Sequence, residues 1–484
     1  MTELLKTAYN TEKFKENGHQ LIDILTRYLQ NNLFDNNDTV IKWKEPNEQL
    51  EFWKSKLIDN SGTSDLFSSI ISNSIHVHNT KYLGHQISPP VPVSALAGLI
   101  SSLLNNGSAI YEMGATSVVM EKIIIDNLCK KIGYNEKADG FLTSGGTLAN
   151  LTALLAARQA MIDEDIWENG QQTKLAVMVS EEAHYCIDRA VRIMGWGSEG
   201  IIKIPVTNEF VMQTDLLENY YQKAIEKGIK VIAVVGSACS TSTGKYDNIS
   251  DIAKFCTQKK LWFHVDGAHG GAATYSKKYK YLLEGIEKAD SIVIDFHKML
   301  MTPSITTALI FKNGNVSYNT FSQKAQYLWE SADEQEWYNL ARRTFECTKL
   351  MMSIQIYSII HSYGNQLFDD FVTTLYDLGK TFAKLITKNS NFELALIPDS
   401  NIVCFRYIGN NLNKEELNEK NNKIRKTLTE NGEFYIVQTK LKGLIYLRVT
   451  IMNPFTTGEE LNLLLNKIEM LANSLKTLLK NEFL

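Results

Sequence analysis

The chain has 484 residues, of which 44% are hydrophobic and 21% are charged, and its formal net charge at pH 7 is −4. That length predicts two or three domains, or one large domain with appendages, and the weak negative charge argues against nucleic acid as a partner. The six cysteines form no CxxC pair, and no stretch approaches the ~20 apolar residues of a membrane span, so we expect a cytoplasmic protein with no zinc module, disulfide scaffold or membrane contact.

Three segments follow one another along the chain. Residues 1–85 predict polar amphipathic helices, because apolar residues recur with helical spacing in GHQLIDILTRYLQNNLF. Residues 86–355 alternate short apolar runs with amphipathic helices, which predicts an α/β domain built on a mainly parallel sheet. Residues 356–484 combine paired strands, such as GLIYLRVTIM, with helices, which predicts a small α+β domain.

A turn rich in glycine and hydroxyl groups opens a helix near residue 146. In FLTSGGTLANL, the stretch that contains Gly146 and Thr147 leads directly into an Ala/Leu-rich helix. The unpaired N–H groups of a helix start, together with two glycines, favour the binding of a phosphate. The alternative is an ordinary glycine turn with a Ser or Thr N-cap.

Asp266 ends the apolar run LWFHVD and is followed by small residues, including Ala268. Ligands of open α/β sheets bind beyond the carboxyl ends of the strands, and small residues let a flat group lie against the backbone. A metal site of His264, Asp266 and His269 is the alternative, although the glycines fit close backbone approach better than a metal cage.

Lys298 follows another buried run, in DSIVIDFHKML. A lysine in that position is costly unless its charge is paired, its pKa is lowered, or its amine is covalently occupied. Covalent occupation explains the combination, because a Schiff-base lysine, a carboxylate for a pyridinium nitrogen and a phosphate-binding turn are the groups that pyridoxal 5'-phosphate requires. His184 lies between a predicted strand and a predicted helix, where its ring either stacks on the cofactor or is merely a packed or capping residue.

Six ordered motifs resemble the group II pyridoxal-phosphate-dependent amino-acid decarboxylases, a family that includes glutamate, aromatic amino-acid and 2,4-diaminobutyrate decarboxylases. They are KYLGHQISPP, SGGTLANLTALLAAR, SEEAHY, HVDGAHGGA, DFHKML and LRVTIMNPFTT. The resemblance implies that Lys298 carries the cofactor, that Asp266 faces its ring nitrogen and that Ala268 and His184 contact its ring. The residues implied near the phosphate or elsewhere on the cofactor are Gly146, Thr147, Ser240 or Thr241, and His297.

The same resemblance implies the architecture of fold-type I pyridoxal-phosphate enzymes. Residues 1–85 would be a helical dimerisation segment, residues 86–355 the large cofactor domain and residues 356–484 a small C-terminal domain. The active site would lie at the interface of a homodimer.

The implied activity is that of a lyase that decarboxylates an L-amino acid. In this family a loop tyrosine often protonates Cα, and Tyr338 in SADEQEWYNLARR is the candidate, with Tyr327 as its rival and an ordinary loop tyrosine as the alternative. Replacement of that proton donor can divert such enzymes to oxidative deamination, which gives an aldehyde and is the alternative activity for this chain. A catalytically dead homologue that serves as a binding protein is disfavoured, because Lys298, Asp266 and His184 are all present.

Three residues match family positions that contact the substrate. Arg448 resembles the arginine that meets the substrate's α-carboxylate, with a structural ion pair as the alternative. His85 and Gln86 match the side-chain pocket, and two polar groups would be left unpaired against an aromatic face. We therefore expect a polar acyclic amino acid, acidic or diamino, with a tyrosine-type aromatic substrate as the alternative.

Overall fold

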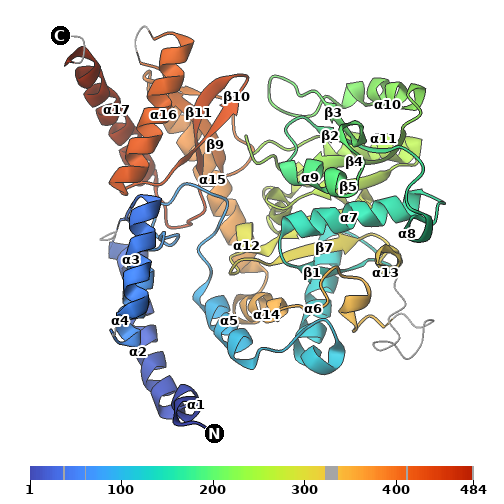
Figure 1. Cartoon of the computed structure of the whole chain (residues 1–484). Coiled ribbons are helices and arrows are strands. Elements are labelled where there is room, and N and C mark those ends of the chain that lie inside the picture. Colours follow the sequence, from blue (N-terminus) through green and yellow to red (C-terminus); the bar gives the residue numbers. More distant parts are fainter. Residues whose placement is uncertain (36–38, 60, 322–335, 410–411, 482–484) are drawn as a thin grey trace. The chain divides into compact units, whose positions relative to one another are not determined.

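The computed structural model describes residues 1–35, 39–59, 61–321, 336–409 and 412–481 (Figure 1). The chain forms two compact units. The large unit comprises Gln86–Asp377 and Pro398–Asn401, and the small unit comprises Met1–His85, Leu378–Ile397 and Ile402–Leu484. The N-terminal segment and most of the C-terminal part therefore share one unit, whereas the sequence analysis treated them as two segments.

The large unit is built on a seven-stranded sheet in the order β1-β7-β6-β5-β4-β2-β3. All of its strands are parallel except β7, which runs antiparallel to β1 and β6. Its central strands are buried on both faces, as their unbroken apolar runs require, so the prediction of a mainly parallel α/β sheet is confirmed. The strands are β1 (Asp139–Thr143), β2 (Leu175–Ser180), β3 (Ile201–Ile204), β4 (Lys230–Ser237), β5 (Trp262–Asp266), β6 (Ser291–Asp295) and β7 (Thr307–Phe311).

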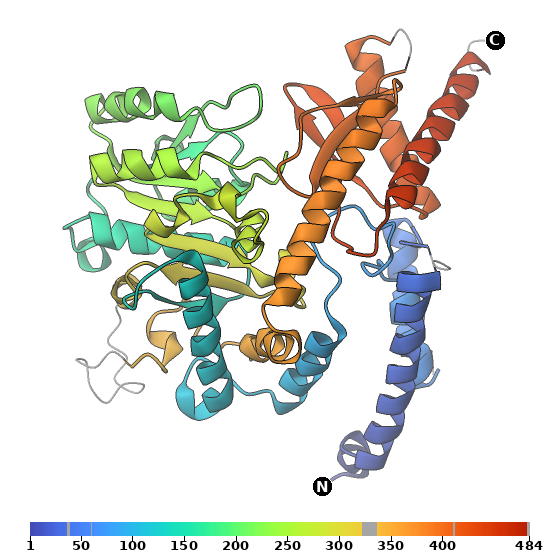
Figure 2. The ribbon, with the colours of Figure 1, turned by 180° about the vertical axis from the view of Figure 1, so that it is seen from behind.

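Helices cover both faces of this sheet. Helix α7 (Gly146–Met161) lies across one face with α9 (Tyr185–Ile193) beside it (Figure 1), and α11 (Ile249–Lys259) covers the opposite face (Figure 2). The buried side of α7 is rich in alanine, so its axis approaches the strands closely and its first turn is held at the edge of the sheet. The unit's other α-helices are α5 (Pro92–Leu104), α6 (Tyr111–Ile132), α8 (Ile166–Asn169), α10 (Leu217–Glu226), α12 (Phe296–Met299), α13 (Asn315–Thr320) and α14 (Met352–Tyr363).

The small unit contains a four-stranded antiparallel sheet in the order β10-β11-β9-β8. Its strands are β8 (Phe392–Leu394), β9 (Ile402–Tyr407), β10 (Val437–Leu441) and β11 (Leu444–Thr450), and it is joined to the large unit by α15 (Gln366–Lys388). Its other α-helices are α1 (Glu3–Ala8), α2 (Thr11–Gln30), α3 (Pro46–Ile58), α4 (Thr63–Ser72), α16 (Lys414–Asn431) and α17 (Gly458–Asn481). Within the described part of the chain, no helix combines the length and the apolarity that a membrane crossing requires.

Candidate active site

A pocket of about 290 Å³ opens at the carboxyl ends of the parallel strands of the large unit. This is the edge at which ligands of open α/β sheets bind. Residues far apart in the sequence meet there, because β1, β2, β4, β5 and β6 all end at this edge. The predicted site residues that line the pocket are Gly146, Thr147, His184, Ser240, Thr241, Asp266, Ala268, His297 and Lys298.

The turn before α7 presents backbone donors to the pocket. Gly145 has a φ of +101°, a conformation that favours glycine, and among the described residues no side chain caps the first turn of α7. A Cβ atom on Gly146 would lie 3.2 Å from both carboxylate oxygens of Asp295 and 3.5 Å from Cβ of Ala268. Glycine at position 146 therefore keeps this side of the pocket open.

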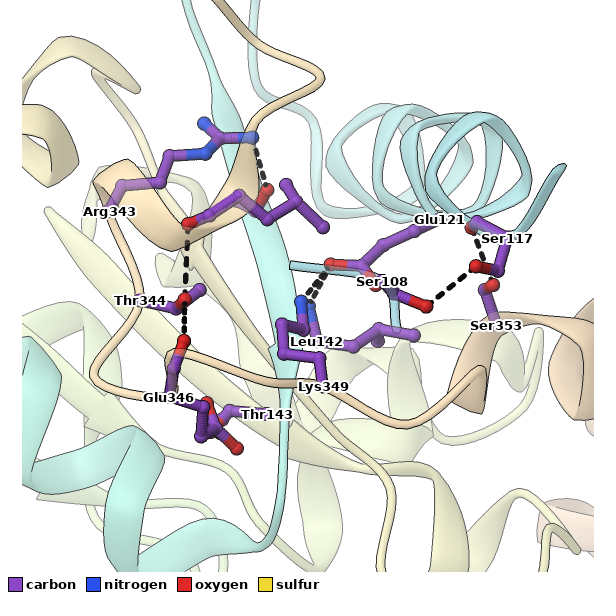
Figure 3. Close-up of polar contacts among 12 residues, drawn as sticks. Ser108, Ser117, Glu121, Leu142, Thr143, Arg343, Thr344, Glu346, Lys349 and Ser353 are labelled. Carbon is purple, nitrogen blue, oxygen red and sulfur yellow. Dashed lines mark hydrogen bonds and ion pairs between the residues drawn. The ribbon is translucent and has the colours of Figure 1, made fainter. Parts of the chain in front are cut away.

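Glu346 holds the residues that precede this turn (Figure 3). Its carboxylate accepts hydrogen bonds from the hydroxyl of Thr143 (3.0 Å) and from the backbone N–H and hydroxyl of Ser144 (3.0 and 2.7 Å). A carboxylate that accepts several such bonds fixes the backbone more strongly than neutral acceptors do. Glu346 lies about 200 residues beyond the turn, so no local pattern in the sequence links the two.

Lys298 lies on the one-turn helix α12, directly after β6, rather than on the strand itself. Its Nζ is 2.9 Å from Oδ2 of Asp295, and the side chain of Asp295 is only 2% exposed. Burial lowers the pKa of Lys298, but the contact with Asp295 and the charge of Asp266 together offset that effect, so the pKa lies above its ordinary value. The structure thus pairs the lysine's charge with a residue to which the sequence analysis gave no role.

Asp266 is positioned by the sheet. It ends β5, where it pairs with Ser237 of β4 and Val293 of β6, and its Oδ1 accepts a hydrogen bond from the N–H of Ala268 (3.2 Å). The side chain is largely buried, at 8% exposure of the residue. A carboxylate held in this way at the pocket is a fixed acceptor for a protonated ring nitrogen.

His184 caps helix α9 at the mouth of the pocket. Its Nδ1 accepts a hydrogen bond from the N–H of Cys186 (3.3 Å), which leaves the other ring nitrogen, Nε2, to carry the proton. Burial lowers the pKa of His184, partly opposed by the carboxylate of Asp266, so the ring is neutral near pH 7. A neutral, planar ring beside Asp266 and Lys298 suits contact with an aromatic cofactor.

A buried relay lies behind the pocket and fixes the orientation of Asn150. The indole N–H of Trp262 donates to Oγ of Ser291 (2.9 Å), and the same oxygen lies 2.8 Å from Nδ1 of His264. Oδ1 of Asn150 can only accept, so Nε2 of His264 donates to it (2.7 Å), and the neutral ring leaves Nδ1 to accept from the Ser291 hydroxyl. The Asn150 amide donates to Sγ of Cys186 (3.4 Å). Burial lowers the pKa of His264 to about 4, so the relay is uncharged.

The alternative of a metal site can be compared with these contacts. Both ring nitrogens of His264 are engaged in the relay, and Nε2 of His269 lies 2.8 Å from Oδ1 of Asn401. Within the described ranges, no cluster of three or more His, Cys, Asp or Glu side chains has an arrangement that could hold a metal ion.

The remaining predicted residues lie outside the pocket lining. The ring of Tyr338 packs against Tyr111 (centroids 5.5 Å apart), and Tyr327 lies outside the described residues. Gln86 begins the large unit, and its segment runs beside the lysine helix, since Ser88 donates to the carbonyl of His297 (3.5 Å). His85 and Arg448 belong to the small unit, where Arg448 lies on β11.

Two further pocket residues, Asp295 and Asn150, were not predicted from the sequence, although their spacing offered a signal. Asp295 stands three residues before Lys298, a spacing that places two side chains on one side of a helical turn, so the signal was present. Asn150 comes one helical turn after Gly146 and could have been found in the same way.

The chain is similar in sequence to known proteins. The family model described as "Pyridoxal-dependent decarboxylase conserved domain" matches residues 66–408. An aromatic-L-amino-acid decarboxylase of Bacillus atrophaeus is 26% identical over 98% of each chain, and an aspartate 1-decarboxylase of Aliivibrio fischeri is 28% identical over 85% of this chain and 83% of the relative. An L-2,4-diaminobutyrate decarboxylase of Acinetobacter baumannii is 26% identical over 98% of this chain and 95% of the relative.

Solved structures share the fold. The glutamate decarboxylase domain of a Vibrio parahaemolyticus protein, described as diaminobutyrate-pyruvate transaminase and L-2,4-diaminobutyrate decarboxylase, superimposes with a TM-score of 0.85, at 23% identity over 96% of each chain. Mouse CSAD in its apo form gives a TM-score of 0.86, at 22% identity over 94% of this chain and 98% of that one.

Proposed function

Because the chain belongs to the pyridoxal-dependent decarboxylase family and is a pyridoxal-phosphate-dependent amino-acid decarboxylase, we propose that its substrate is a polar acyclic L-amino acid. The proposed site is supported by one observation: a single pocket is lined by Lys298, Asp266, His184 and the Gly146 turn. The relatives carry aromatic, aspartate and diaminobutyrate activities in their names, so the substrate is argued from this chain's own residues.

The residues of the pocket fit pyridoxal phosphate. The uncapped first turn of α7, opened by Gly145 and Gly146, would hold the phosphate, and Lys298 would hold the aldehyde carbon covalently. Asp266 would accept a hydrogen bond from the protonated ring nitrogen, while Ala268 and His184 would bound the ring. When bound, the cofactor supplies an electron sink for the electron pair released as the bond from Cα to the carboxyl carbon breaks.

The protein's part in the reaction is positioning and proton control. Asp266 would keep the ring-nitrogen proton in place through a charge-assisted hydrogen bond, which maintains the electron sink. His184 would stack on the cofactor as a neutral ring. Its Nδ1 accepts a hydrogen bond from the N–H of Cys186, so the ring proton is carried by Nε2. Tyr338 would supply the proton to Cα, and Arg448 would orient the substrate's carboxylate.

The proposed preference for a polar substrate is supported by Gln86 and His85. Gln86 is 9% exposed, and its Nε2 has no hydrogen-bond partner within the described residues. A buried amide without a partner costs about 1–3 kcal/mol, which a polar substrate side chain would recover and an aromatic one would not. Burial lowers the pKa of His85, so its neutral ring can donate and accept.

Between an acidic and a diamino substrate, the cations that act on His85 favour the acidic one. Burial is the main cause that lowers the pKa of His85, and the guanidinium charges of Arg448 and Arg425 lower it further. Both cations therefore act on this residue. A positive field at the proposed side-chain pocket attracts a carboxylate and repels an ammonium group.

A product assay tests the proposal. The purified enzyme with pyridoxal phosphate is offered glutamate, aspartate, cysteine sulfinate, diaminobutyrate, ornithine, lysine, tyrosine, DOPA and tryptophan separately, and amine and carbon dioxide are quantified. We expect equal amounts of amine and carbon dioxide from one acidic substrate. Preferred turnover of an aromatic substrate would overturn the polar assignment, and an aldehyde with peroxide would show that the chemistry is oxidative deamination.

We also propose that the enzyme acts as a homodimer. None of the residues of α1 to α4 is buried, although these helices carry apolar side chains, and α5 exposes a row of them: Leu96, Leu99, Ile100, Leu103 and Leu104, each 48–65% exposed. Exposed apolar surface of this kind favours burial against a second copy. Sedimentation equilibrium should give twice the chain mass of 54.8 kDa, and a monomer at micromolar concentration would contradict the proposal.

A further inference from the structure

The chemistry of Lys298 depends on which carboxylate holds its charge. Two carboxylates act on it, Asp295 on β6 and Asp266 on β5. Asp295 makes a direct ion pair at 2.9 Å, whereas Asp266 acts on the lysine by charge alone. Asp295 is also fixed by the Thr307 hydroxyl, which donates to its Oδ1 at 2.5 Å, and its Oδ2 lies 3.6 Å from Nε2 of His297.

The other titratable groups facing Lys298 do not compete for its charge. They are His184 and Cys186 at the start of α9 and Cys239 after β4. Burial raises the pKa of Cys239 to about 12 and also raises that of Cys186, so both thiols are protonated near neutral pH. His184 is neutral for the reason given above, which leaves the two aspartates as the charged partners of the lysine within the described residues.

We propose that Asp295 is a positioning residue that sets the pH at which Lys298 reacts with the cofactor, an inference that rests on the proposed role of Lys298. The amine must be free before it can react, so the ammonium group first gives one proton to solvent. The Lys298 nitrogen would then form a double bond to the aldehyde carbon as its two N–H bonds and the carbon–oxygen bond break, and the oxygen would leave as water with two protons, equal in number to those lost by the amine. No electrons are transferred, and no further reactant is needed.

Charge and burial oppose each other at this lysine, and Asp295 is the carboxylate in direct contact with it. Burial alone favours the neutral amine, while a carboxylate in contact favours the ammonium form by about 1–3 pH units. Because the pKa of Lys298 lies above its ordinary value, the surrounding charges together outweigh burial, and Asp295 contributes more than Asp266. Removing the Asp295 charge while keeping the shape of the side chain should leave burial unopposed except by Asp266.

The test is the pH profile of cofactor attachment to the apoenzyme, measured before any turnover. Attachment is stopped at intervals with borohydride, and the modified peptide is quantified by mass spectrometry. In Asp295→Asn the midpoint should fall by about 1–3 pH units relative to the wild type. The matched variant Asp266→Asn removes the other carboxylate of the pocket and should shift the midpoint less. An unchanged midpoint in Asp295→Asn, or a larger shift in Asp266→Asn, would overturn the inference.

A second measurement needs no variant, in case Asp295→Asn does not fold. Lys298 of the wild-type apoenzyme is acylated with an amine-reactive reagent at a series of pH values, and its peptide is quantified. Labelling should still be rising at pH 10.5, the ordinary value for a lysine, and a midpoint below that value would contradict the inference. If borohydride instead traps the cofactor on another lysine, the proposed role of Lys298 fails, whereas the labelling result still reports the protonation of Lys298, so the two failures are distinguishable.

Discussion

The ammonium group of Lys349 lies 2.7 Å from the carboxylate of Glu121, and both side chains are buried (Figure 3). The same carboxylate accepts the backbone N–H of Leu142 in β1 (2.8 Å). Lys349 precedes α14, Glu121 lies on α6 and Leu142 leads into the pocket turn, so one buried ion pair ties three elements together behind the site.

Replacing Lys349 by methionine should destabilise the large unit by about 3–5 kcal/mol, because the Glu121 carboxylate would remain buried without its cation. Denaturant unfolding followed by tryptophan fluorescence measures the loss. The double variant Lys349→Met/Glu121→Leu is the matched control, and it should recover part of the stability since no charge is left unpaired. A double variant with a lower free energy of unfolding than Lys349→Met alone would refute this explanation.

Lys298→Ala should abolish turnover, and borohydride should no longer attach the cofactor to the protein, because no other lysine among the described residues lines the pocket. Lys277→Ala is the control, since the Lys277 side chain is 82% exposed and lies outside the pocket. Turnover and the mass of the reduced protein are measured for both. Covalent cofactor in Lys298→Ala at the wild-type level would disprove the assignment.

Arg425→Met should lower kcat/KM for an acidic substrate about tenfold relative to a diamino substrate, which corresponds to ~1.4 kcal/mol of lost charge attraction. The pKa of His85 should rise in the same variant, since Arg425 is one of the causes that lower it, and NMR titration measures this without turnover. Lys426→Met removes a neighbouring cation that is 74% exposed and serves as the control. Equal effects of the two variants on both substrates would rule out a role for Arg425 in charge selection.

Stability should fall as the pH is lowered from 6.5 to about 4 through His264. The unfolded chain binds a proton at His264 below pH 6.5, whereas burial prevents the folded protein from doing so until about pH 4. Through His264, the free energy of unfolding should therefore fall by about 3 kcal/mol as the pH falls across this window. In His264→Gln this part of the pH dependence should vanish, so the two stability curves should converge on acidification. Parallel curves would show that His264 does not titrate as described.

Local patterns predicted much of the site because each of its parts is short. The turn at Gly146, the strand that ends on Asp266 and the run before Lys298 are all continuous in the sequence, and a parallel sheet brings such strand ends to one edge. Glu346 could not be found in this way, because its link to Ser144 joins segments about 200 residues apart. Tyr338 remains a prediction from family resemblance, since its ring packs against Tyr111 rather than lining the pocket.

The sequence by itself determined the α/β class and predicted that Lys298 and Asp266 follow strands at one edge of the sheet, because apolar periodicity and the residues at strand ends are local properties. The role of His184 rested on the family resemblance. The tertiary structure alone decided which acid faces Lys298. Two carboxylates were available, and the choice between Asp295 and Asp266 depends on distance and burial, which a one-turn helix after β6 sets. Electrostatic attraction weakens with distance and strengthens with burial, so the charge state of the lysine could be read only from the folded chain.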